Sequence, residues 1–220
     1  MSHLSDTEVR VLGVLMGKAA TTPDQYPLSL NGLTLGCNQK TSRDPVTTLD
    51  DDEAEAALDE LRDRRLAFRV DMAGSRVPKY RHQADESWEL TRAEYALLTV
   101  LLLRGPQSLG QLRQRTERIH AFRDLDEVRD TLEGMEQREL EPQTLVRELP
   151  HRAGTKDIRY AHVLGAPIEK SAAEAVTEVE SPLAPSPREL EIEELKAEVA
   201  ELKNSLQKMR EEFDQFRSQF

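Results

Sequence analysis

Few residues of this sequence have the types and spacing that catalysis or metal binding requires. None of the five histidines stands at metal-ligand spacing from another histidine or from the single cysteine, Cys37. The 220 residues contain no glycine-rich phosphate loop, nucleophile elbow or HExxH motif. Lys40 follows Cys37 closely enough to lower a thiol pKa, but a half-buried structural cysteine is the more common situation. We therefore expect no enzyme, no bound metal and no cofactor.

Basic, amide and hydroxyl side chains offer a second chemistry, the binding of nucleic acid. The segment Asn38–Arg43 combines all three kinds, which suits hydrogen bonds to phosphates and base edges, although it can equally be a polar loop held by its own backbone contacts. Further basic residues recur in one expected helix and in two expected hairpins, where a solvated strand face is the alternative. The candidates for contact with double-stranded DNA are Asn38, Gln39, Lys40, Thr41, Arg43, Arg76, Lys79, Arg81, Arg113, Arg115, Arg152 and Lys156.

An internal repeat indicates how these residues are positioned. Residues 4–15 align with residues 90–101, and both copies begin with a hydroxyl residue followed three positions later by glutamate, which is the pattern of a helix capping box. Two more blocks match in the same order, one within the third expected helix and one around the expected hairpin turn. Three matched blocks in one order indicate a duplicated domain with loops of different length.

Each copy is expected to form a helix, a short helix, a third helix and a two-stranded hairpin. The short helices are predicted near Ser29–Cys37 and Ser108–Arg118. The first hairpin strand alternates, with Phe68 and Val70 on one face and Arg69 on the other. The predicted fold is mainly α with small β-hairpins, arranged as two tandem winged helix-turn-helix domains followed by a C-terminal coiled-coil helix. Two generic α+β domains are the alternative.

The chain is expected to divide into four parts. Residues 1–85 and 86–165 form the two winged-helix domains, 166–187 a Pro/Ala/Glu-rich linker, and 188–220 the coiled-coil helix. From residue 192 onward the sequence has a heptad repeat, with basic residues at the e positions and acidic or neutral residues at the g positions. This charge pattern favours a parallel pair of helices, so we expect a homodimer. The alternative is a lone amphipathic helix folded against the body. The expected dimerisation residues are Ile192, Leu195, Val199, Leu202, Leu206, Met209, Phe213 and Phe216.

The charge distribution limits how DNA could be bound. The net charge is −11, so the composition does not give the basic character that usually indicates nucleic-acid binding. The third helices begin with the acidic runs Asp50–Glu53 and Asp124–Glu127, which phosphates repel, so contacts are expected from the hairpins and from Asn38–Arg43. No apolar run approaches the roughly 18–20 residues of a membrane span, and the first residues do not resemble a secretion signal. We expect a cytoplasmic protein with no membrane contact.

Several motifs resemble those of one bacterial family. They are Thr21–Gly32, Cys37–Val46, Leu101–Gly105 and the set Gly74, Arg76, Val77, Lys79 and Tyr80. Together they resemble the YceH family of UPF0502-type bacterial proteins over nearly the whole chain, with mild departures at Pro106 and Gln111. The resemblance implies a cytoplasmic tandem winged-helix protein, and no catalytic residue carries over from it.

Two functions remain open on the sequence alone. The leading hypothesis is a homodimeric DNA-binding transcriptional regulator. The alternative is a protein-interaction scaffold, or adaptor, in which the acidic helices hold a basic protein partner without DNA contact. An enzyme would need a ligand pocket that the sequence does not indicate.

Overall fold

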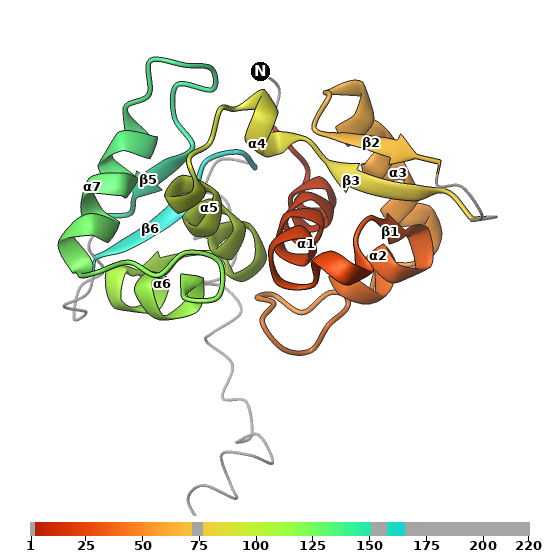
Figure 1. Ribbon diagram of the computed structural model, residues 1–220, viewed down its shortest axis with the longest axis horizontal. Coiled ribbons are helices and arrows are strands. Elements are labelled where there is room, and N and C mark those ends of the chain that lie inside the picture. Colours follow the sequence, from red (N-terminus) through yellow and green to blue (C-terminus); the bar gives the residue numbers. More distant parts are fainter. Residues whose placement is uncertain (1–2, 72–76, 151–157, 166–220) are drawn as a thin grey trace, which may run out of the picture. The chain divides into compact units, whose positions relative to one another are not determined.

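The computed structural model describes residues 3–71, 77–150 and 158–165 (Figure 1). The first half of this part contains α1 (Asp6–Thr21), the 3-10 helix η1 (Pro23–Gln25), β1 (Leu28–Ser29), α2 (Leu30–Cys37), α3 (Asp51–Asp63), β2 (Ala67–Val70) and β3 (Lys79–His82). The short helix α4 (Ala84–Ser87) leads to the second half, which contains α5 (Arg92–Arg104), β4 (Gln107–Ser108), α6 (Leu109–Thr116), α7 (Leu125–Glu136), β5 (Val146–Glu148) and β6 (Arg159–His162). For the described residues, the expectation of a mainly helical chain with small β-hairpins is confirmed, and a short third strand joins each hairpin.

The two halves have the same order of elements. Each runs helix, strand, helix, helix, strand, strand, and each forms a three-stranded antiparallel sheet, in the order β1-β3-β2 and β4-β6-β5. In both sheets the short strand after the first helix pairs with the last strand of the same half. The repeat in the sequence therefore corresponds to a repeat in the structure.

Local hydrogen bonds start the helices where the sequence predicts. Ser5 and Glu8 form a complete capping box at α1, as do Thr91 and the glutamate three residues on at α5. At α6 the side chain of Gln111 fulfils the same role, because its Oε1 accepts a hydrogen bond from the backbone nitrogen of Ser108 at 3.0 Å. The departure at Gln111 from the family pattern thus leaves the helix start intact.

Helices α1 and α5 bring the two halves together around a shared core. A Cβ atom placed at Gly13 of α1 would lie 3.0 Å from the Cβ of Leu102 in α5, so the two helices approach closely there. The hydroxyl of Tyr95 in α5 donates to the carbonyl of Met16 in α1 at 2.7 Å and lies 3.0 Å from Nε2 of the buried His82. One apolar cluster accordingly contains residues of both halves.

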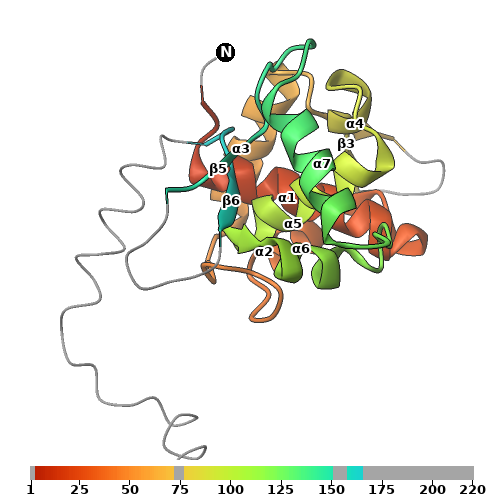
Figure 2. The same ribbon diagram turned by 90° about the vertical axis from the view of Figure 1, so that its left-hand side faces the viewer.

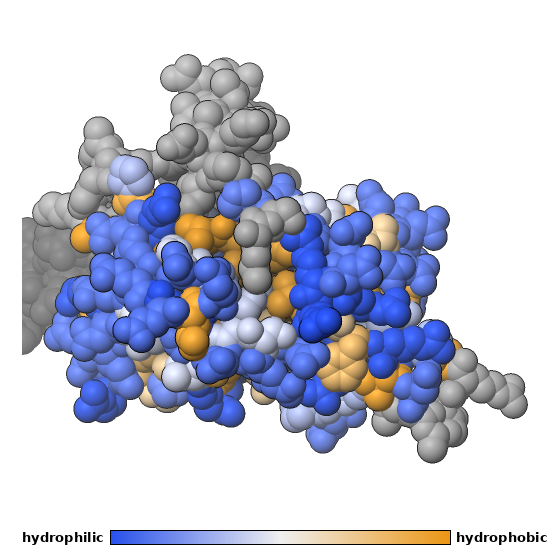
Figure 3. All heavy atoms as spheres, turned by 90° about the horizontal axis from the view of Figure 1, so that it is seen from above, coloured by the Kyte–Doolittle hydropathy of each residue, from blue (hydrophilic) through white to orange (hydrophobic). Residues whose placement is uncertain are grey.

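The chain ends of this body also meet. The backbone nitrogen of Leu4 donates to the carbonyl of Leu164 at 2.7 Å, which joins the start of the first half to the end of the second. All of the described residues belong to one compact unit. Seen from above, the surface is mostly hydrophilic, with apolar atoms in scattered patches (Figure 3).

The apolar alternation of β2 lies on the outer face of its sheet. Phe68 pairs with Arg81, and Arg69 pairs with Tyr80. Because directly paired residues share a face and Tyr80 is buried, Ala67 and Arg69 lie on the side of β2 that carries Tyr80; Ala67 is buried there, whereas the Arg69 side chain is 51% exposed. Phe68 is half-buried beneath the guanidinium of Arg81, which lies 4.7 Å from the ring centroid. The predicted alternation agrees with this pairing, since Phe68 and Val70 share one face and Arg69 lies on the other.

Several predictions fall on residues outside the described part of the chain. These include the linker at 166–187, the coiled coil at 188–220 with all eight dimerisation residues, and the candidate contacts Arg76, Arg152 and Lys156. The domain boundaries stay predictions. Across the residues that are described, no helix combines the length and the apolar character that crossing a membrane requires.

Candidate nucleic-acid interface

The described candidate residues lie in three places. Asn38, Gln39, Lys40, Thr41 and Arg43 belong to the loop of residues 38–50 between α2 and α3; Lys79 and Arg81 belong to β3; Arg113 and Arg115 belong to α6. Figures 1 and 2 show α2, the 38–50 loop and α6 along the same side of the molecule. The structure thus brings the loop and α6 together, whereas Arg81 points to the outer face of the first sheet.

Asn38 holds the 38–50 loop closed. Its Nδ2 donates to the carbonyl of Leu49 at 2.7 Å, and its Oδ1 accepts from the backbone nitrogen of Leu49 at 2.8 Å. Thr47 adds a hydrogen bond from its hydroxyl to the carbonyl of Cys37 at 3.0 Å. For Asn38, the structure shows the backbone-bound role that is usual for amides in turns.

Arg43 also bonds within the first half. Its Nε donates to the carbonyl of Gly36 at 3.1 Å, and its Nη2 donates to Oε1 of Gln39 at 3.0 Å. Burial, together with the nearby positive charges of Arg10 and Arg104, lowers the pKa of Arg43 to about 10. The neighbouring side chains of Lys40 and Thr41 are exposed.

The loop rests against the end of α5 in the second half. The backbone nitrogen of Asp44 donates to the carbonyl of Leu103 at 2.9 Å, and Nη2 of Arg104 donates to the hydroxyl of Ser42 at 2.6 Å. Arg10 of α1 bridges the two parts, because Nη1 donates to Leu103 at 3.1 Å and Nη2 to the carbonyl of Pro45 at 2.5 Å. The loop is therefore fixed by both halves of the protein.

The arginines of α6 bind nearby backbone and amide oxygens. Nε and Nη2 of Arg113 donate to the carbonyls of Phe122 and Arg123 at 3.3 and 2.8 Å. Arg115 donates to Oε1 of Gln107 in the strand before α6. All of these hydrogen bonds go to uncharged oxygens.

A group of positive charges without paired carboxylates results, which we call the basic face: Lys40, Arg43, Arg104, Arg113 and Arg115. Burial lowers the pKa of Arg104, and the adjacent charge of Arg115 lowers it further. Within the described residues, all ion pairs between side chains lie elsewhere, so none neutralises this group. Next to this group, the carboxylate of Asp44 raises the pKa of the buried Arg10, although burial has the larger effect and lowers it.

Charge is divided between the helices. Helices α2 and α6 contain no acidic residue, whereas α3 contains seven and α7 five. In α3 the acidic run starts at the helix cap, where the side chain of Asp50 accepts from the backbone nitrogen of Glu53 at 2.8 Å. The negative side chains there interact favourably with the positive end of the helix dipole, but they repel phosphates. A polyanion would meet less repulsion on the side of α2, the loop and α6.

Two residues of this region escaped prediction from the sequence. Arg10 is 4% exposed and lies on the buried face of α1. Its counterpart in the repeat is the fully buried Ala96. Arg104 is the counterpart of Lys18, and a basic residue in the last turn of a helix is ordinary. A charged residue aligned with a buried alanine was the available signal for Arg10.

The described residues offer no metal site, in the sense that no group of three or more histidine, cysteine, aspartate or glutamate side chains is gathered among them. Cys37 is fully buried, and burial raises the pKa of its thiol to about 11 despite the neighbouring Arg10 and Arg43. At neutral pH the thiol is therefore protonated and a poor nucleophile.

Comparison with known proteins places this arrangement in a family. A family model described as "Protein of unknown function, DUF480" matches residues 4–155. A UPF0502 protein of Azoarcus sp. (strain BH72) is 44% identical over 218 residues, which cover 99% of this chain and 94% of the relative. UPF0502 proteins of Opitutus terrae and Geotalea daltonii are 47% and 50% identical over 175 and 160 residues, covering 80% and 73% of this chain and 75% and 72% of those relatives. The chain therefore belongs to the UPF0502 family, as its sequence motifs predict.

Proposed function

We propose that this protein is a tandem winged-helix protein that binds double-stranded DNA through its basic face and acts as a regulator. The single observation that carries the proposal is the group of arginines at the 38–50 loop, the end of α5 and α6, which form no ion pair with a carboxylate of the described residues. Positive charges held close together repel one another, and the phosphates of a duplex relieve that repulsion while releasing counterions.

The order of elements supports the winged-helix part of the proposal. A helix, a short strand, two helices and two strands, with the short strand pairing to the last strand, occur in both halves. In a helix-turn-helix protein the second helix of the motif enters the major groove. Helices α3 and α7 hold that position here, and their acidic side chains make this docking unfavourable. The DNA would lie instead along α2, the loop and α6.

The expected coiled-coil helix at residues 188–220 would join two chains into a homodimer. Two basic faces joined through residues 192–216 would bind one duplex with an affinity raised by effective concentration. The proposal predicts a dimer in sedimentation equilibrium. Removal of residues after Gly165 should yield a monomer that binds DNA more weakly.

Fluorescence anisotropy with a labelled mixed-sequence duplex of about 25 base pairs tests the proposal at about 50 and 200 mM salt. We expect the affinity to fall at least about tenfold over this range, because each phosphate contact releases counterions. Lys40→Glu should weaken binding about three- to tenfold and reduce the salt slope by about one.

Arg62→Glu is the matched control for this experiment. It makes the same change in charge at an exposed site on α3, where Arg62 pairs with Asp59 at 2.5 Å. It should leave DNA affinity within about twofold of the wild type, apart from the small effect of net charge. Equal losses in the two variants, or no binding at the lower salt, would refute the basic-face proposal.

The acidic helices favour one second candidate, a scaffold that binds a basic protein. Seven acidic residues in α3 create a negative surface suited to a cationic partner. Under this alternative, duplex DNA does not bind, and a single stoichiometric protein is recovered after nuclease treatment. That protein should be lost when Asp59 and Glu60, both exposed on α3, are changed to lysine.

A further inference from the structure

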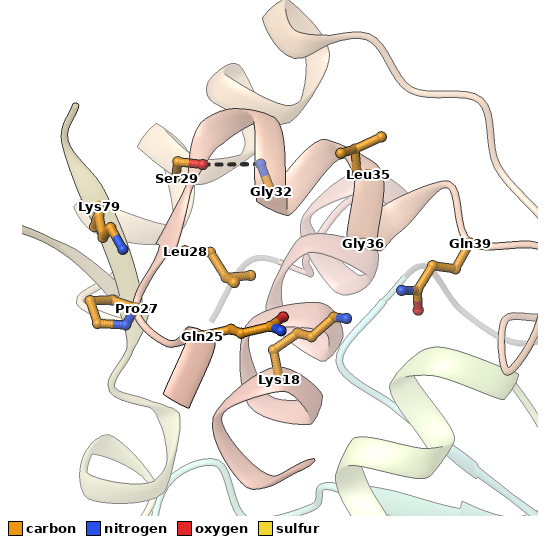
Figure 4. Close-up of a pocket in the computed structure, with 10 residues that line it drawn as sticks. All are labelled: Lys18, Gln25, Pro27, Leu28, Ser29, Gly32, Leu35, Gly36, Gln39 and Lys79. Carbon is orange, nitrogen blue, oxygen red and sulfur yellow. Dashed lines mark hydrogen bonds between the residues drawn. The ribbon is translucent and has the colours of Figure 1, made fainter. Parts of the chain in front are cut away.

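A pocket of about 310 Å³ opens on the first half, between the end of α1, strand β1, helix α2 and the start of β3 (Figure 4). Lys18 reaches it from α1 and Lys79 from β3. In the view of Figure 4, Lys79 lies at one side and Gln39 at the other, with Gln25 and Lys18 between them. Its volume is at the lower end of the range for small-molecule sites.

The polar lining of this pocket is cationic or neutral. Its two charged residues, Lys18 and Lys79, are both basic, and Gln25, Gln39 and Ser29 supply amide and hydroxyl groups. In the part of the chain that the structure describes, neither lysine forms an ion pair with a carboxylate. Two ammonium groups without counter-charges in one pocket favour a ligand that carries negative charge.

The first turn of α2 adds to this preference. Ser29 caps the eight-residue helix, and its hydroxyl accepts from the backbone nitrogen of Gly32 at 3.2 Å. Both residues line the pocket, so the positive end of the helix dipole faces it. A Cβ atom at Gly32 would lie 3.3 Å from the hydroxyl oxygen of Ser29, so glycine leaves room for the cap.

The rest of the lining indicates what accompanies the charge. Leu35 is 64% exposed at the rim, although it is a large apolar residue, and Leu28 lies deeper in the pocket. An inorganic ion would leave this apolar surface uncovered. A small organic molecule with one doubly charged group would be attracted by both lysines and would cover Leu35 with its neutral part.

We propose that this pocket binds a small phosphate monoester, such as a sugar phosphate or a mononucleotide. Lysine ammonium groups bind phosphate as point charges, and the glutamine amides hydrogen-bond the neutral part of the molecule. The proposal is independent of the basic face, because it concerns different cations. The same pocket chemistry would also accept a backbone phosphate of a nucleic acid, and the test separates the two sources.

Isothermal titration calorimetry of the full-length protein at constant ionic strength provides the test. The probes are adenosine 5′-monophosphate, inorganic phosphate and adenosine, which lacks the phosphate. We expect one saturable site for adenosine monophosphate, weaker binding of inorganic phosphate and at least about tenfold weaker binding of adenosine. Lys18→Gln with Lys79→Gln should raise the Kd for adenosine monophosphate at least about tenfold.

Arg62→Gln with Arg129→Gln is the matched control, since it removes two positive charges from exposed sites outside both the pocket and the basic face and should leave this Kd unchanged. Should the double lysine variant fail to give a native circular dichroism spectrum, the two single variants are titrated, and each should weaken binding. Equal affinity for adenosine and its monophosphate, or unaltered binding in the lysine variants, would overturn the proposal. So would variants that lose affinity for duplex DNA when the wild type shows no saturable binding of either small anion, because the pocket would then be a contact for backbone phosphate.

Discussion

Replacement of Arg10 by methionine tests whether the contact between the two halves depends on one buried guanidinium. Arg10 is 4% exposed, and its two hydrogen bonds go to Leu103 in the second half and to Pro45 in the 38–50 loop. Methionine keeps most of the volume and removes both bonds. The cluster around the loop loses one of its positive charges at the same time.

The magnitude follows from the partners that remain. Two hydrogen bonds from a charged donor contribute about 1.5–3 kcal/mol each. The Leu103 carbonyl keeps the bond from the backbone nitrogen of Asp44, and the exposed Pro45 can be hydrated, so neither oxygen bears the full penalty of an unpaired buried group. Removal of a desolvated charge, which burial already disfavours by lowering the pKa of Arg10, offsets part of the loss. We expect the free energy of unfolding to fall by about 2–3 kcal/mol.

Urea denaturation followed by far-UV circular dichroism measures this change. With a slope near 2 kcal/mol per molar urea, the midpoint should fall by about 1 M. Hydrogen exchange gives a second readout, because the amide of Asp44 should exchange faster once the loop is no longer held from α1. Arg92→Met is the control, since Arg92 is exposed and its Nε makes a single bond to the Ile119 carbonyl. A midpoint for Arg10→Met no lower than that of the control would refute this account of the contact.

Three further predictions concern single residues. Gly36→Ala should destabilise by about 1–3 kcal/mol in thermal or urea melts, because its Cβ would lie 2.7 Å from Cγ1 of Val14; Gly110→Ala, whose Cβ would meet no described atom within 4 Å, should stabilise by up to about 1 kcal/mol. Burial lowers the pKa of His162 to about 4, so the unfolded chain takes up the proton first, and stability should fall as the pH drops from about 6.5 toward 4. The part of this loss that is due to His162 should be about 2 kcal/mol at pH 5, so His162→Gln should lose that much less than the wild type, while the buried His82, whose pKa is also lowered, still contributes. Tyr95→Phe should cost about 1–3 kcal/mol in urea melts, because a buried histidine nitrogen and a main-chain carbonyl both lose their hydroxyl partner; a loss below about 0.5 kcal/mol would contradict that role.

Features that depend on neighbouring residues could be predicted from the sequence. The capping residues of α1, α3 and α5 and the position of α2 follow from side chains within four residues of one another. Ser29, for example, caps α2 where the short helix was expected to begin. The internal repeat strengthened these predictions, because helices expected in one half were also expected at the matching positions of the other half.

Features that depend on pairing between distant residues could not be predicted in the same way. The alternation in β2 gives the period of the strand, but the facing of Phe68 depends on which residue of β3 it pairs with. Likewise, the polar character of Asn38 fits both DNA contact and loop closure, and only the position of Leu49 shows that the amide is bound to backbone. The role of Arg10 could not be predicted either, because its guanidinium bonds to α5, which lies about ninety residues further along the chain.

The hydrogen bond between Leu4 and Leu164 gives the folded body the connectivity of a ring. With its ends bonded to each other at 2.7 Å, a short peptide could join them and new termini could be opened near Glu89, between the two halves. Such a circular permutant would keep both sheets and the packing of α1 on α5 while reversing the order in which the halves are synthesised. A native fold in the permutant would mean that neither half has to fold first, and that the tail beyond residue 165 could be attached to either half.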